Sequence, residues 1–131
     1  MGDTIIFVGS DPRLESEIAV GRDNALHFRC PADGSRVALY GPYVTLPPGH
    51  FRIELAFTVD KLAPGIVAVE LCYSQARQQL YSRFCFPWEL AAGLIRISYH
   101  FTESINELEV RLIVPPEFSG SIKQLSFTRR N

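Results

Sequence analysis

Most of the chain alternates between hydrophobic and polar residues with a period of two. In the segment FRIELAFTV, Phe51, Ile53 and Leu55 alternate with Arg52 and Glu54. This alternation is typical of a β-strand with one buried face, because successive side chains of a strand point to opposite sides. The same period recurs in the segments 66–73, 80–86, 94–101, 108–114 and 121–129. Shorter alternating runs occur in 3–8, 25–30 and 36–41.

Turn-forming residues separate these segments. They are Asp33-Gly34, Pro47-Pro48-Gly49, Ala63-Pro64-Gly65, Pro115-Pro116 and Ser119-Gly120. Short strands at such spacing predict an all-β fold, an antiparallel sandwich of about eight or nine strands. One or two short helical turns are expected, at residues 12–20 and 87–94. No linker or repeat interrupts the pattern, so residues 1–131 are expected to form a single β-sandwich domain.

The pairing of the segments 66–73 and 80–86 can be predicted if their turn centres on residues 75–78. Leu80, Phe84 and Phe86 then face the core, and Arg83 lies opposite Glu70 on the polar face. In this register Cys72 faces Tyr81 and Ala68 faces Cys85. The two cysteines share a face but are not partners, so a disulfide between them is not expected. A slip of one residue would reverse these faces.

Charge and composition limit the function classes. The chain has 13 basic and 14 acidic residues, a net charge of -1, and 47% hydrophobic residues. Nonspecific nucleic-acid binding needs an excess of cations, so it is not expected. No apolar run reaches the ~20 residues of a membrane helix, and no signal peptide is apparent. Three cysteines without metal-binding spacing favour a reducing, cytoplasmic location.

Catalytic signatures are not found. The chain has no GxSxG, HExxH, P-loop or GxGxxG motif, and its three histidines, His27, His50 and His100, are far apart in sequence. A cupin-like enzyme would need several histidines and a carboxylate on barrel strands, which these three scattered histidines fit poorly. We therefore expect a protein that is not an enzyme and that uses no cofactor.

Carboxylates and arginines share the polar strand faces. Glu54 and Glu109 each have an arginine two residues away, Arg52 and Arg111, while Glu70 has the predicted partner Arg83. Such a face is either a solvated surface of ion pairs or a platform that donates and accepts hydrogen bonds to sugar hydroxyls. The residues alone leave both interpretations open.

Four aromatic residues do not occupy the core-facing positions of the clearest strands. They are Tyr40, Tyr43, Tyr81 and Trp88. An exposed aromatic plane can stack on the apolar face of a sugar ring. Trp88 follows a proline between two strands, so it stands either on a binding loop or in the core as a plug.

The segment YGPYVTLPPGHFRIELAF, residues 40–57, resembles the central motif of jelly-roll, galactose-binding-like domains of the carbohydrate-binding-module type. The segment LEVRLIVPPEFSGSIKQLSFTR also resembles the end of such domains, and the resemblance spans roughly residues 24–129. It implies a non-catalytic sugar-binding domain with its ligand on a sheet face or at the loop rim. Some members hold a structural calcium, but the acidic residues between 3 and 23 form no ligand pattern, so no metal is expected.

These observations predict a lectin-like module that binds a saccharide or glycoconjugate. The candidate ligand-binding residues are Tyr43, Arg52, Glu54, Glu70, Tyr81, Arg83, Trp88, Arg96 and His100. The alternative is a sandwich that mediates protein–protein contact or homodimerisation, with Ile113 and residues 39–44 in the interface.

Overall fold

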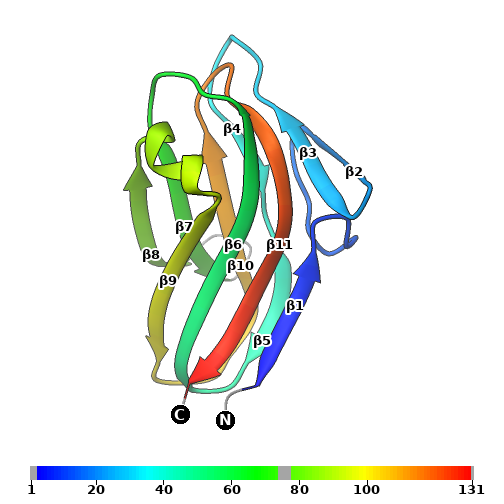
Figure 1. Cartoon of the computed structure of the whole chain (residues 1–131). Coiled ribbons are helices and arrows are strands. Elements are labelled where there is room, and N and C mark those ends of the chain that lie inside the picture. Colours follow the sequence, from blue (N-terminus) through cyan, green and yellow to red (C-terminus); the bar gives the residue numbers. More distant parts are fainter. Residues whose placement is uncertain (1–2, 74–77, 131) are drawn as a thin grey trace.

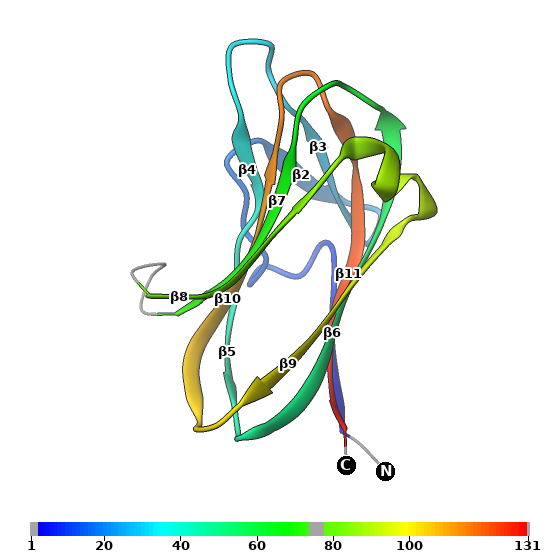
Figure 2. The same cartoon turned by 90° about the vertical axis from the view of Figure 1, so that its left-hand side faces the viewer.

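The computed structural model describes residues 3–73 and 78–130. Within that part, eleven β-strands form two antiparallel sheets, which pack face to face as a sandwich (Figures 1 and 2). The prediction of an all-β antiparallel sandwich is confirmed. The structure has two strands beyond the nine expected segments, at Ala19–Arg22 and Pro42–Leu46. Both are short strands of four and five residues that lack a long alternating pattern.

One sheet has six strands. These are β1 (Thr4–Val8), β2 (Ala19–Arg22), β3 (Ala25–Arg29), β6 (Gly49–Lys61), β9 (Leu94–Phe101) and β11 (Ser119–Arg130). Their order is β2-β3-β11-β6-β9, and β1 also pairs with β11. The long strands β6 and β11 run along most of the molecule (Figure 1).

The other sheet has five strands. These are β4 (Arg36–Leu39), β5 (Pro42–Leu46), β7 (Val67–Tyr73), β8 (Gln78–Cys85) and β10 (Ile105–Val114). Their order is β4-β10-β7-β8, and β5 also pairs with β10. Consequently β4 and β5 follow each other along the same side of β10, with only Tyr40 and Gly41 between them.

The core lies between the sheets and follows the predicted alternation. Inward side chains of β6, β7, β9, β10 and β11 form one buried cluster that includes Ile53, Leu71, Ile97, Leu108 and Phe127. Fully burying a side chain of this size stabilises the fold by about 1.5–3 kcal/mol. The intervening polar residues of these strands are left on the outer faces of the two sheets.

The predicted orientation of β8 is wrong. Ser82 lies opposite Glu70, and Arg83 lies opposite Val69, because the register differs by one residue and shifts again between Leu71 and Cys72. A one-residue difference turns every side chain of a strand to the other face. Phe84 is therefore 71% exposed instead of buried. The predicted Glu70–Arg83 pair does not form.

The cysteines of this hairpin do not share a face. Cys85 lies opposite Val67 and belongs to the core cluster, whereas Cys72 lies opposite Gln79 on the outer side of the sheet. The two form no disulfide, as predicted. The turn residues 74–77, on which the register prediction rested, lie outside the described residues.

The two expected helical turns have different outcomes. Residues 87–92 form a 3-10 helix, η1 (Pro87–Ala92), and Gly93 follows its last residue with a φ of +81°, as predicted. Residues 12–20 form no helix, because the backbone N–H groups of Glu15 and Glu17 donate to the carbonyls of Tyr40 and Val37 at 2.8 and 3.1 Å instead of to helical partners. Across the described ranges, no helix is long and apolar enough to cross a membrane.

Candidate functional site

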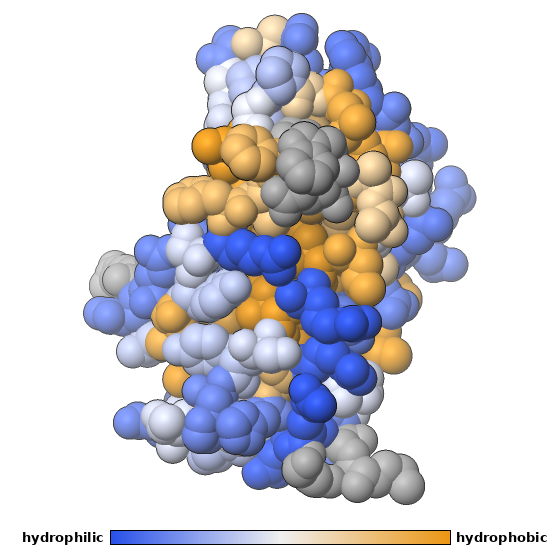
Figure 3. Space-filling view, turned by 60° about the vertical axis from the view of Figure 1, so that its left-hand side comes forward, coloured by the Kyte–Doolittle hydropathy of each residue, from blue (hydrophilic) through white to orange (hydrophobic). Residues whose placement is uncertain are grey.

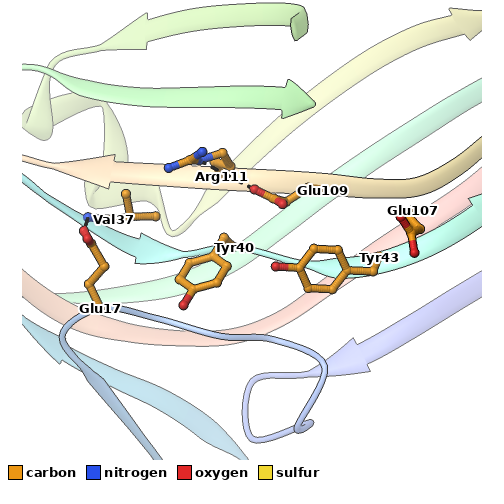
Figure 4. A pocket seen from close by; sticks show the side chains of 7 residues that line it. All are labelled: Glu17, Val37, Tyr40, Tyr43, Glu107, Glu109 and Arg111. Atoms are coloured by element: carbon orange, nitrogen blue, oxygen red, sulfur yellow. Dashed lines mark hydrogen bonds and ion pairs between the residues drawn. The ribbon is translucent and has the colours of Figure 1, made fainter. Parts of the chain in front are cut away.

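A pocket of about 440 Å³ lies on the outer face of the five-stranded sheet. It is formed by the junction of β4 and β5, by β10, and by the loop before β2 (Figure 4). The lining residues are Glu17, Val37, Tyr40, Tyr43, Glu107, Glu109 and Arg111. The volume falls within the range of about 300–1,000 Å³ that small-molecule sites occupy.

The register of the sheet builds the floor of this pocket. Glu109 and Arg111 are two residues apart on β10, so they project from the same face. Cys72 and Glu70 of β7 lie opposite them. On the other side of β10, Pro42 lies opposite Glu109, and Leu39 lies opposite Leu112.

The break between β4 and β5 brings two tyrosines to the pocket. Gly41 has a φ of +119° in this break, and its carbonyl accepts a hydrogen bond from the N–H of Val110 at 2.7 Å. Tyr40 is fixed from the other side, because its backbone exchanges two hydrogen bonds of 2.8 Å with Glu15. The rings of Tyr40 and Tyr43 consequently lie in a row below Glu109 and Arg111 (Figure 4).

Glu109 and Arg111 form the central ion pair of the pocket. Arg111 Nε lies 3.7 Å from Glu109 Oε2, and the Glu109 side chain is 5% exposed. This separation exceeds hydrogen-bond length, and no hydrogen-bond acceptor reaches the buried Arg111 Nε. Burial raises the pKa of Glu109, while Arg111 and the hydroxyl of Tyr43 oppose that rise. Arg111 Nε therefore keeps an unused hydrogen-bond donor in the pair.

The surroundings of the pair disfavour negative charge. Burial, with contributions from Glu109 and Glu15, raises the pKa of Tyr43 to about 12. Burial raises the pKa of Cys72 to about 11, with Glu70 as the next cause. Burial and the nearby Glu15 also raise the pKa of Tyr40. Both tyrosines are consequently neutral hydrogen-bond donors near neutral pH.

This combination suits a ligand with an apolar face and several hydroxyl groups. The tyrosine rings offer planes for stacking. The carboxylates accept hydrogen bonds, and the guanidinium donates them. Across the described ranges, no three His, Cys, Asp or Glu side chains are placed so that they could hold a metal ion.

The predicted ligand-binding residues do not gather on one face. Tyr43 lines the pocket, and Glu70 lies beside it opposite Arg111. Four others lie on the outer face of the six-stranded sheet: Arg52, Glu54, Arg96 and His100. There Glu54 forms ion pairs with Arg96 at 2.9 Å and with Arg52 at 3.7 Å. These contacts match the alternative interpretation of a solvated surface of ion pairs.

Arg83 and Tyr81 lie at the margin between the sheets. Arg83 Nη1 donates a hydrogen bond to the carbonyl of Arg96 at 3.2 Å. Tyr81 packs edge-on against Tyr99, with ring centroids 6.2 Å apart. The side chain of Trp88 lies outside the described residues.

Of the seven residues that line the pocket, only Tyr43 is among the predicted ligand-binding residues; Glu17, Val37, Tyr40, Glu107, Glu109 and Arg111 are not. The two-residue spacing of Glu109 and Arg111 was a usable signal, because it places both on one strand face. The contribution of Glu17 was hidden by the helix expected over residues 12–20. Glu107 has a positive φ of 54° just after the start of β10, which no pattern in the sequence indicated.

No protein-family model matches the chain, and no curated protein matches its sequence. Solved structures do share its fold. The C-terminal CBM6 of LamC, a marine laminarinase from Zobellia galactanivorans, has a TM-score of 0.57 and 10% identity, over 97% of this chain and 100% of that chain. A mutant of the carbohydrate-binding module CBM29-2 has a TM-score of 0.55 and 10% identity, over 98% and 92% of the two chains.

A third similar structure contains an enzyme module as well. It comprises the CBM22-1 and GH10 modules of the Clostridium thermocellum xylanase Xyn10B complexed with xylohexaose, with a TM-score of 0.55 and 11% identity. The match covers 100% of this chain and 28% of that one. Other CBM29-2 mutants are complexed with cellulohexaose and mannohexaose. The chain thus has the jelly-roll β-sandwich fold found in carbohydrate-binding modules.

Proposed function

We propose that the protein is a non-catalytic saccharide-binding module whose ligand lies over Tyr40 and Tyr43. The observation that carries this proposal is the row of two tyrosine rings beneath a partly unsatisfied Glu109–Arg111 pair, within one pocket. A pyranose presents C–H groups on its faces and hydroxyls around its rim. The rings therefore fit the faces, and the charged pair fits the rim.

The geometry of the fold supports an extended ligand at this place. The pocket is on the outer face of a sheet and not inside the core, so a ligand longer than one sugar ring can reach it. The similar modules named above, which are complexed with xylohexaose, cellulohexaose and mannohexaose, support a saccharide as the class of ligand. On the opposite face Glu54 is bonded to Arg96 at 2.9 Å, but Arg52 Nε has no hydrogen-bond partner, as Arg111 Nε has none in the pocket. The two tyrosine rings are therefore what favours the pocket over that face.

A glycan array followed by calorimetric titration tests the proposal. We expect binding of at least one oligosaccharide with a dissociation constant between millimolar and micromolar. The variant Tyr43→Ala should abolish that binding, whereas Arg96→Ala, on the opposite face, should retain it. No binding to any saccharide on the array, or equal loss in both variants, would contradict the proposal.

Contact with another protein or a second copy is the alternative candidate, and a specific surface favours it. Apolar side chains gather around η1 and the adjoining strand ends (Figure 3). Phe84, Ile66 and Leu94 are 71%, 52% and 41% exposed there. The residues expected to form an interface, Ile113 and 39–44, lie elsewhere: Ile113 is half-buried, and Tyr40 and Tyr43 line the pocket. Light scattering that gives a monomer at every concentration would count against homodimerisation.

A further inference from the structure

The charge of the pocket is strongly unbalanced. Glu17, Glu107 and Glu109 line it, and Arg111 is the one basic residue among its lining side chains. With all four ionised, the lining carries a formal charge of -2, although the whole chain carries only -1. Such a local excess favours a positively charged ligand and opposes a negatively charged one.

The outer two carboxylates are not neutralised by the protein. Among the described residues, neither Glu17 nor Glu107 has an ion-pair partner. Glu17 Oε1 accepts a hydrogen bond from the N–H of Val37 at 2.6 Å, which fixes the side chain and leaves its negative charge in place. Arg111 is directed to Glu109 and not to these two residues.

The carboxylates are spread along the pocket. Glu17 and Glu107 lie at opposite ends of the row of tyrosines, and Glu109 lies between them (Figure 4). This spacing does not suit a single metal ion, in keeping with the lack of a metal-binding group among the described residues. It suits a ligand that carries several positive groups at intervals along its length.

Burial is the main cause of the raised pKa of Tyr40, Tyr43 and Cys72 around the pocket. Nearby carboxylates add to the rise: Glu109 and Glu15 at Tyr43, Glu15 and Glu17 at Tyr40, and Glu70 and Glu109 at Cys72. The carboxylates of the pocket therefore act in the same direction as burial at all three groups.

We propose that the pocket selects saccharides that carry free amino groups, such as oligomers of unacetylated glucosamine, and rejects uronate or sulfated saccharides. This inference rests on the proposed function and adds the charge class of its ligand. A protonated amine on a pyranose is a donor of three hydrogen bonds, and a carboxylate accepts them as short, charge-assisted bonds. The tyrosines stack on the same rings.

A set of matched hexasaccharides tests the charge class directly. The glucosamine hexamer, its N-acetylated counterpart and cellohexaose share one β-1,4-linked backbone and differ only at C2, while a galacturonate hexamer supplies a negative ligand. Titration should be done at mildly acidic pH, where the amine is protonated. We expect the glucosamine hexamer to bind at least about tenfold more tightly than cellohexaose at low salt, and this ratio to shrink in high salt. The galacturonate hexamer should bind most weakly.

Two variants show whether the pocket causes the preference. The double variant Glu17→Gln, Glu107→Gln should bring the ratio between glucosamine hexamer and cellohexaose towards one. The matched control Glu54→Gln removes a carboxylate from the opposite face and should keep the ratio. Equal binding of the amino and neutral hexamers, tightest binding of the galacturonate, or a ratio that survives the double variant would overturn the inference while leaving saccharide binding in place. Failure of every hexamer to bind would overturn the charge class, and it would contradict the proposed function only if the glycan array were negative too.

Discussion

Arg111 Nε lies 3.7 Å from Glu109 Oε2 on the outer face of β10, above the rings of Tyr40 and Tyr43. The two residues are close enough to attract each other but too far apart to satisfy each other's hydrogen bonds. A charged pair in this state is costly to bury and ready to bond a polar ligand. This relationship is central to the proposed binding site.

Removing a stacking ring should weaken binding without unfolding the protein. We expect Tyr40→Ala to lower saccharide affinity by about 5- to 150-fold, because stacking on an aromatic ring contributes about 1–3 kcal/mol in comparable base-stacking sites. Calorimetric titration measures the affinity, and circular dichroism checks the fold. His100→Ala, which stands on the opposite face, should bind as the wild type does. A Tyr40→Ala protein with unchanged affinity would show that the ligand does not use this ring.

The stability of the protein should depend on pH through Glu109. Burial raises the pKa of this carboxyl in the folded state, so the folded protein holds more protons than the unfolded one in that range. The free energy of unfolding therefore falls as the pH rises from the ordinary carboxyl pKa through the raised one. Glutamine does not titrate, so we expect the free energy of unfolding of Glu109→Gln to fall less as the pH rises. The variant should therefore become more stable relative to the wild type at higher pH.

Urea unfolding at pH values from about 4 to 7 measures this difference. The two stability curves should diverge as the pH rises. Parallel curves for the wild type and Glu109→Gln would mean that the carboxyl titrates alike in both states.

The ion pairs of the opposite face should matter little. Glu54 bridges Arg52 and Arg96, but these side chains are partly exposed to solvent. Exposed pairs contribute no more than about 1 kcal/mol each and are screened by salt. Glu54→Ala should therefore lower the free energy of unfolding by roughly that amount, less in high salt, and leave saccharide affinity unchanged. A loss of affinity in this variant would move the site to the six-stranded sheet.

Gly41 is needed to place the two tyrosines. Its φ of +119° is unfavourable for a residue with a side chain, and an added Cβ would collide with the carbonyl oxygen of Arg13. We expect Gly41→Ala to destabilise the protein by about 1–3 kcal/mol in urea unfolding and to weaken binding. At Gly21 an added Cβ makes only ordinary contacts with Ser10, so Gly21→Ala is the matched control and should cost far less. Equal destabilisation by the two changes would refute this role for Gly41.

Much of the fold could be predicted because burial imposes a period of two on the sequence. The long strands β6, β7, β9, β10 and β11 have one face in a shared core, and each shows that alternation. The edge strand β8 was misread because alternating hydrophobic residues do not reveal which face is buried at an exposed edge. Phe84 and Phe86 occupy the outward positions there.

The site could be predicted only in part, because its residues come from four separate segments. Tyr40 and Tyr43 could be recognised as aromatic residues away from the core-facing positions. Glu109 and Arg111 could be recognised as a charged pair on one strand. Their convergence depends on the pairing of both β4 and β5 with β10, which alternation alone does not specify. Arginines and carboxylates were therefore grouped by the polarity of their strand faces, although the two outer faces lie on opposite sides of the sandwich.

The location of the ligand is tested most directly by nuclear magnetic resonance on isotope-labelled protein. Amide shifts would be followed while the glucosamine hexamer, or the best ligand from the glycan array, is added. The largest changes should fall on residues of the pocket, at 15–17, 37–44 and 107–111, and the amides of Arg52, Ser98 and His100 should not move. Changes that instead centre on β6 and β9 would contradict a binding site on the five-stranded sheet.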